Sequence, residues 1–134
     1  MATIIAVVGK ASSGKTTLIK EAYKYFKGIP PERGDIRPDD NAILTIKGKK
    51  VGFASIGDME KEVSKAIKNF LKKKCDIIII ACRSRGGTQK VILRHTMNNT
   101  IYWIWKPQIK TPKKQRKSNS DALTHLVSLI SKEC

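Results

Sequence analysis

The chain has 134 residues, of which 40% are hydrophobic and 28% are charged. This composition predicts one domain with a single core and argues against a disordered, collagen-like or coiled-coil chain. The longest apolar run, Ile77 to Cys82, is too short to cross a bilayer, and the N-terminus has no basic lead of a secretory signal. Three cysteines without CxxC spacing favour a reducing compartment, so we expect a cytoplasmic protein without a membrane span.

The charge balance is strongly basic. Lysine and arginine number 27 and aspartate and glutamate 11, which gives a formal net charge of +16 at pH 7. Such a balance predicts a polyanionic partner: nucleic acid, nucleotide or an acidic membrane. The alternative is a lysine-rich surface that only keeps the protein soluble.

The N-terminal part of the chain predicts a strand, a helix and a hairpin. Thr3 to Val8 is apolar and β-branched, as in a strand buried on both faces, and a helical pattern follows until Gly28. Residues 28–41 are rich in proline, glycine and charge and predict a long loop. The apolar runs 42–46 and 51–56 are joined by four residues, a connection that predicts an antiparallel hairpin.

The C-terminal part predicts two more strands and three helices. We expect helices over 59–74 and 89–97, strands over 76–81 and 101–105, and a loop over 83–88. Residues 106–120 hold six lysines and arginines and no acid, so they predict a basic linker. A last helix is expected over 121–132, capped by Ser120 or Asp121. The order predicts an α/β fold over residues 1–134, with a mostly parallel sheet and one antiparallel edge strand.

One segment carries a recognisable chemistry. Residues 9–16, GKASSGKT, match GxxxxGK[ST] between a predicted buried strand and a predicted helix. The glycines allow a tight turn that points successive N–H groups into one concavity, where the start of the helix also favours anions. The positions expected to bind phosphates are Gly9, Ala11, Ser12, Ser13, Gly14, Lys15 and Thr16.

These residues resemble the Walker A motif of P-loop NTPases, and the resemblance extends over roughly residues 3–105. It implies a three-layer P-loop fold in which Lys15 contacts the β- and γ-phosphates and the Thr16 hydroxyl holds Mg²⁺. It also implies that Thr17 contacts the α-phosphate. The predicted hairpin resembles Ras-like GTPases, which implies switch segments at 28–41 and 57–62. The chain has neither the DxxG nor the NKxD motif of that family, so ATP is expected rather than GTP.

A magnesium site of this kind needs a second acid. In P-loop enzymes this acid ends a hydrophobic strand beside the first one, and Asp58, after the predicted strand 51–56, fits that description. Asp58 could instead serve as the N-cap of the helix that follows. Asp35, Asp39 and Asp40, in the long loop, are the rival acids.

Two arginines are expected beside the phosphates. Ligands of open α/β sheets bind beyond the carboxyl ends of the strands, and Arg83 and Arg85 follow the strand 76–81. An arginine there could stabilise charge during phosphoryl transfer, or it could hold another partner's phosphate. Trp103 and Trp105 would lie on one face of the last strand, where a ring could stack on adenine or pack in the core.

These features predict an enzyme, a Mg²⁺-dependent ATPase whose hydrolysis switches a loop and controls a partner protein or nucleic acid. The first alternative is a small phosphotransferase acting on a nucleoside, nucleotide or polynucleotide; the second is a nucleotide-dependent nucleic-acid binder without catalysis. The basic segment 106–117 is a candidate nucleic-acid contact, and a neighbouring subunit could complete the site.

Overall fold

The computed structural model describes residues 2–9, 15–28, 41–54, 60–83, 87–94, 100–106 and 112–134. In these ranges the chain forms five strands and four helices. The strands are β1 (Thr3–Gly9), β2 (Asn41–Ile46), β3 (Lys49–Ala54), β4 (Ile77–Arg83) and β5 (Thr100–Lys106). The helices are α1 (Lys15–Lys27), α2 (Glu60–Lys72), α3 (Thr88–Arg94) and α4 (Pro112–Glu133).

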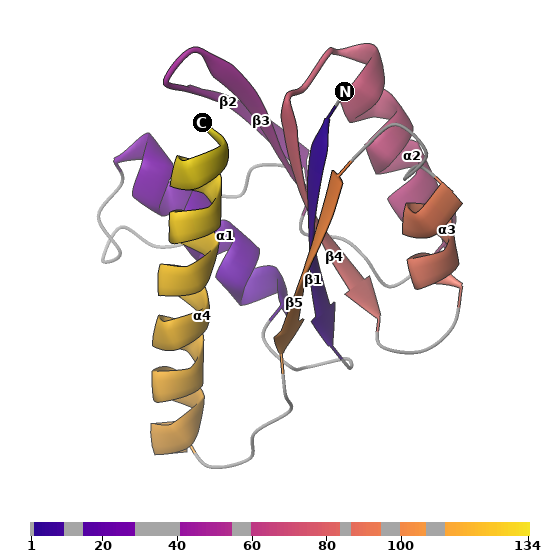
Figure 1. Ribbon diagram of the computed structural model, residues 1–134. Helices are drawn as coiled ribbons and strands as arrows, with labels where there is room; N and C mark the ends of the chain where they lie inside the picture. The colour runs from indigo at the N-terminus through magenta and orange to yellow at the C-terminus, as the bar shows by residue number, and fades with distance from the viewer. Residues whose placement is uncertain are drawn as a thin grey trace.

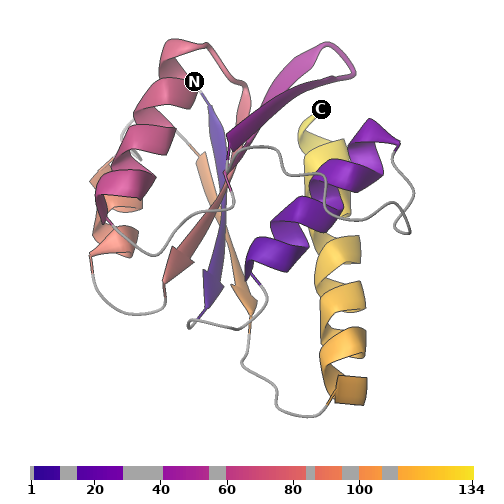
Figure 2. The same cartoon turned by 180° about the vertical axis from the view of Figure 1, so that it is seen from behind.

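The strands form one sheet in the order β2-β3-β4-β1-β5, with α1 and α4 on one face and α2 and α3 on the other (Figures 1 and 2). The pairs among β3, β4, β1 and β5 are parallel, and β2 is antiparallel to β3. The predicted α/β class, the mostly parallel sheet and the antiparallel pair at its edge are therefore confirmed.

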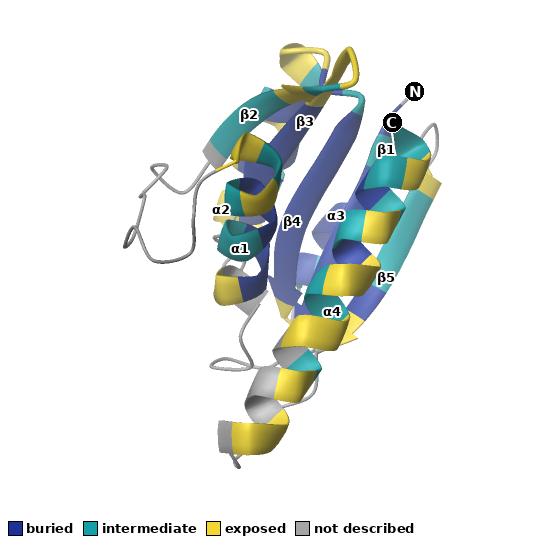
Figure 3. Cartoon of the chain, turned by 90° about the vertical axis from the view of Figure 1, so that its left-hand side faces the viewer, coloured by how far each residue is buried: buried dark blue, intermediate teal, exposed yellow. Residues whose placement is uncertain are grey.

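Strand β1 contributes to a separate core on each face of the sheet. Ile4 and Val8 pack with α2 and α3, whereas Ile5 and Val7 pack with α1 and α4. Side chains alternate along a strand, so a strand covered by helices on both faces needs apolar residues at every position. This burial explains the unbroken apolar runs of β1 and β4, and Figure 3 shows both strands buried between the helices.

The β2–β3 hairpin turns at Lys47 and Gly48, whose φ angles are 50° and 80°. Two successive positive φ values match the right-handed twist of a hairpin, and glycine adopts them without steric cost. The predicted antiparallel hairpin is confirmed, with Ile46 paired to Lys49. The described part of strand β3 is Lys49–Ala54, and the last two residues of the predicted strand, 55 and 56, lie outside the described residues.

The expectation that β3 lies directly beside β1 is wrong, because β4 lies between them. Four isoleucines of β4, Ile77 to Ile80, are at most 1% exposed, so this strand requires neighbours on both sides and helices on both faces. Strand β3 begins with two exposed lysines and pairs with the half-buried β2, so the hairpin lies at the edge.

The prediction of a basic linker over 106–120 is also wrong for residues 112–120, because α4 begins at Pro112. Proline is favoured at the first helical position because the N–H that it lacks would have no partner there. Lysine, arginine and glutamine are good helix formers, so this polar stretch needs no apolar stripe to be helical. Ser120 is not a cap: its carbonyl accepts a hydrogen bond from the Thr124 hydroxyl at 3.0 Å within the helix.

The end of α4 is hydrogen-bonded to the two strands β1 and β5. The Tyr102 hydroxyl donates a hydrogen bond of 2.9 Å to Glu133 Oε1, and the Thr3 hydroxyl donates one of 3.3 Å to Glu133 Oε2. One carboxylate thus joins α4 to both β5 and β1. The buried residues Leu126 and Ile130 pack α4 against the same face as α1.

The bond between Tyr102 and Glu133 predicts a pH dependence of stability. This hydrogen bond and the charge of Glu133 raise the pKa of Tyr102 above its ordinary value. The folded state therefore holds the phenol proton more tightly, so the stabilisation is complete below the unfolded pKa and is lost as the pH rises through the folded pKa. We expect the urea midpoint of the wild type to fall more steeply above about pH 10 than that of Tyr102→Phe. Tyr25→Phe, at an exposed ring, is the control; equal slopes for all three proteins would contradict the prediction.

The three cysteines are withdrawn from solvent to different degrees. Cys75 and Cys82 are buried and Cys134 is half-buried. Burial raises the pKa of the Cys75 and Cys134 thiols, which keeps these two protonated and weakly nucleophilic at neutral pH.

Candidate functional site

The carboxyl ends of three strands meet at the start of the segment predicted to bind phosphate, residues 9–16. Gly9, the last residue of β1, is buried and lies in register with Arg83 of β4 and Lys106 of β5. Helix α1 begins at Lys15 and packs against the sheet through Leu18, Ile19 and Ala22. Residues 10–14 therefore connect a central buried strand to the first turn of a helix, which confirms the local context predicted from the motif.

The predicted phosphate-binding residues are only partly described. Gly9 ends β1, and Lys15, Thr16 and Thr17 form the first turn of α1, with the Thr17 side chain exposed. Ala11, Ser12, Ser13 and Gly14, and the side chains of Lys15 and Thr16, lie outside the described residues. The backbone nonetheless directs the N-terminus of a 13-residue helix toward this segment, where the helix dipole favours an anion.

Arg83 lies closer to this segment than expected. It was predicted in a loop, but it is the last residue of β4, with an exposed side chain, beside Gly9 in the adjacent strand. Its backbone N–H donates to Thr88 Oγ1 at 3.0 Å, and its carbonyl accepts from Gln89 Nε2 at 3.1 Å. The first turn of α3 thus fixes where β4 ends. Arg85 lies outside the described residues.

Thr88 is the positioning residue that sequence reasoning missed. It is 2% exposed, and besides the bond to Arg83 its hydroxyl lies 3.4 Å from Cys82 Sγ. A buried hydroxyl is tolerated because these partners satisfy it. No pattern in the sequence distinguishes Thr88 from an ordinary loop threonine, since its role depends on the approach of α3 to the end of β4.

The candidate magnesium acid Asp58 lies outside the described residues, as do Asp35, Asp39, Asp40 and residues 29–40 and 57–59 of the predicted switch segments. Residues 60–62 of the second segment begin α2. Strand β3 ends at Ala54, which is paired with Ile80 of β4. Two strand spacings, about 10 Å, separate β3 from β1. Ala54 is level with Ala6, three residues before Gly9, which adds about 10 Å along the strands. The resulting separation of about 14 Å equals the longest span of four residues, so position 58 comes level with Gly9 only if the chain after Ala54 is fully extended. In the described part of the chain, no three His, Cys, Asp or Glu side chains are grouped as a metal site would require.

The aromatic residues of β5 alternate between the two faces as expected. Tyr102 packs on the side of α1 and α4, and Trp103 packs on the side of α2 and α3. Trp105 is 62% exposed and is paired with Val8, one residue before Gly9. The Trp105 ring is therefore exposed to solvent near the carboxyl ends of the strands. Stacking of this ring on adenine stays a prediction.

No protein-family model, curated protein or solved structure matches this chain. Among the described helices, none is both long and apolar enough to span a bilayer. Function is therefore inferred from the residues of the chain and from their placement.

Proposed function

We propose that this protein is a P-loop NTPase that binds ATP with Mg²⁺ and hydrolyses it, and that hydrolysis switches a loop that controls a partner protein or nucleic acid. The observation that carries the proposal is the position of GKASSGKT between the buried end of β1 and the first residue of α1. A glycine-containing segment at that junction presents its amides and the positive end of a helix to one point.

The charges near this junction favour a triphosphate. Arg83 and Lys106 end the strands on either side of Gly9, and Lys15 opens α1. Lys15 would pair with the β- and γ-phosphates, and Arg83 would stabilise the charge that develops on the transferred phosphoryl group. Thr88 would act indirectly, by fixing the backbone of Arg83.

Thr16 and Asp58 would hold the magnesium ion. A hydroxyl and a carboxylate are hard oxygen donors, which suit Mg²⁺. The ion would neutralise part of the phosphate charge, and the residues of the chain would bind and orient the nucleotide.

The fate of the γ-phosphate tests the proposal against its alternative, a small phosphotransferase. Purified protein is incubated with Mg²⁺ and γ-labelled ATP, with and without nucleosides or DNA. We expect the label to appear as inorganic phosphate. Label on an added acceptor would instead establish a kinase, and bound nucleotide without turnover would establish a nucleotide-dependent binder.

An Asp58→Ala variant is expected to lose turnover by about 10²-fold or more while retaining most of its ATP affinity. The reason is that Lys15 and the backbone amides still bind the phosphates when the metal is mispositioned, and a small misplacement costs about this much in rate. The measurement is phosphate release at saturating ATP. Asp121→Ala, at an exposed position of α4, is the matched control. Unchanged turnover in Asp58→Ala would show that another acid holds the metal.

A further inference from the structure

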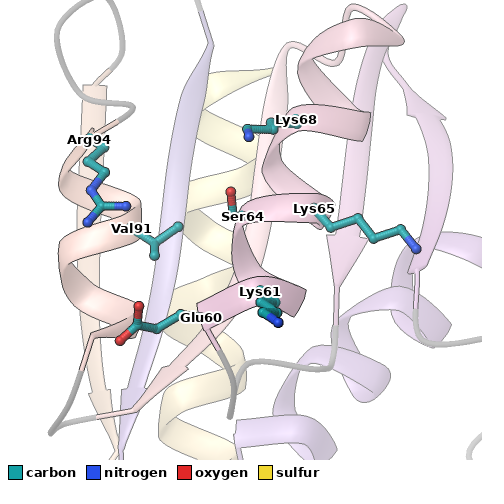
Figure 4. Close-up of a pocket in the computed structure, with 7 residues that line it drawn as sticks. All are labelled: Glu60, Lys61, Ser64, Lys65, Lys68, Val91 and Arg94. Carbon is teal, nitrogen blue, oxygen red and sulfur yellow. The ribbon is translucent and has the colours of Figure 1, made fainter.

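A basic groove lies between α2 and α3, on the face of the sheet opposite α1. It has a volume of about 470 Å³, and the lining residues are labelled in Figure 4: Glu60, Lys61, Ser64, Lys65, Lys68, Val91 and Arg94. Lys68 projects from α2 toward α3, and Arg94 projects from α3 toward α2 (Figure 4). Positively charged side chains of both α2 and α3 thus line the groove.

The basic side of the groove continues along the whole of α2. Lys61, Lys65, Lys68 and Lys72 are all exposed and recur at intervals of four, three and four residues, so they form one stripe of the helix. At a rise of about 1.5 Å per residue this stripe is about 17 Å long. One strand of a nucleic-acid duplex places a phosphate about every 3.4 Å of helix axis, so the stripe matches about five successive phosphates.

The acidic residues of α2 do not neutralise this stripe. Glu60 and Glu62 are both in the first turn of α2, where the helix dipole stabilises a negative charge. Helix α3 has no acidic residue. The Glu60 carboxylate lies against Gly87, the residue before α3, at one end of the groove. Arg94 and Lys68 project toward the groove from opposite sides, so two positive charges border it (Figure 4).

We infer that the α2–α3 groove binds the phosphate backbone of a nucleic-acid duplex. The lysine stripe that borders it is about 17 Å long, which fits an extended polyanion better than a single phosphate. None of the described residues that line it is aromatic, so stacking of unpaired bases, the usual device of single-strand binders, is not provided by them. Contacts of this type carry no sequence information, so binding is independent of base sequence.

This inference is independent of the proposed ATPase. The groove is formed by α2 and α3, whereas the phosphate-binding segment leads into α1 on the other face. A Lys15→Ala variant should therefore bind duplex DNA as the wild type does, and a groove variant should bind ATP normally. Failure of one inference leaves the other intact.

The salt dependence of binding provides the test. A fluorescein-labelled 20-base-pair duplex is titrated with nucleotide-free protein, and anisotropy gives the affinity at 50 and 200 mM KCl. Four cations among the described residues line the groove: Lys61, Lys65, Lys68 and Arg94. If each contacts one phosphate, the slope of log K against log salt is near −3.6, which is about a 150-fold loss of affinity over this range. Lys61→Gln/Lys68→Gln should reduce the slope to about −1.8 and the loss to about 12-fold. Arg94→Gln alone should reduce the slope by about 0.9.

The control variant is Lys113→Gln/Lys114→Gln, which removes the same charge from exposed positions of α4, within the segment predicted earlier as a nucleic-acid contact. Its slope should equal that of the wild type. Circular dichroism and thermal melting establish that each variant is folded. The inference is overturned if the wild type does not bind the duplex, if both double variants lower the slope equally, or if acidic phospholipid vesicles are bound and the duplex is not.

Discussion

A Lys15→Ala variant is expected to bind Mg²⁺–ATP about 10²- to 10⁴-fold more weakly than the wild type. A hydrogen bond to a charged group contributes about 1.5–3 kcal/mol, and a lysine that bridges the β- and γ-phosphates makes two of them. Each 1.4 kcal/mol corresponds to about a tenfold change in affinity. Isothermal titration calorimetry measures the difference directly, because the wild type should give a clear heat of binding.

The matched control for this experiment is Lys24→Ala. Lys24 lies near the other end of α1, about 14 Å along the helix from Lys15, and its removal changes the net charge equally. ATP affinity should then change little. Equal affinities of Lys15→Ala and the wild type would contradict the proposed phosphate contact, and the absence of binding to any nucleoside triphosphate would remove the proposed function altogether.

A Gly52→Ala variant is expected to unfold more easily, by about 1–3 kcal/mol, because the added methyl group overpacks the core. A Cβ atom at this position would lie 2.7, 2.8 and 2.9 Å from three ring atoms of Phe70. The Phe70 side chain is 0% exposed and packs among residues of α2, β4 and β1, so the ring cannot simply move aside. The free energy of unfolding in urea measures the loss.

A second substitution tests whether this contact is the cause. Phe70→Leu removes the ring atoms with which the added methyl group would collide, so the double variant should be more stable than the sum of the two single changes predicts. Thr45→Ala, on the exposed side of β2, should change stability by no more than about 0.5 kcal/mol. Additivity of the Gly52 and Phe70 changes would place the destabilisation elsewhere.

The sequence predicted the elements well where side-chain burial follows a simple period. Thr3 to Val8 and Ile77 to Ala81 are apolar at nearly every position because both faces of their strands are covered. The stripe of α2 is equally plain, since Val63, Ile67 and Phe70 face the sheet. Each of these patterns depends on one element and the core that it faces. A single stretch of sequence is therefore enough to predict that element.

Features that depend on the relative position of two elements were not predictable in this way. The position of β4 between β3 and β1 depends on which strands pair, and the period of a strand does not encode its partner. The first half of α4 is polar, so it has no apolar stripe to reveal it. Of the candidate site, the motif 9–16 and its flanking strand and helix were evident, whereas the support that Thr88 gives Arg83 required the fold.

The central place of β1 has a consequence for biosynthesis. Thr3 pairs with Ile77 on one side and with Thr100 on the other, so β1 is made before either of its neighbours in the sheet. A ribosome that adds about 5–20 residues per second delivers the second neighbour on the order of 5–20 s after the first strand. During this interval the apolar strand lacks at least one of its neighbours in the sheet, so we expect the nascent chain to need shielding from aggregation until β5 has been synthesised.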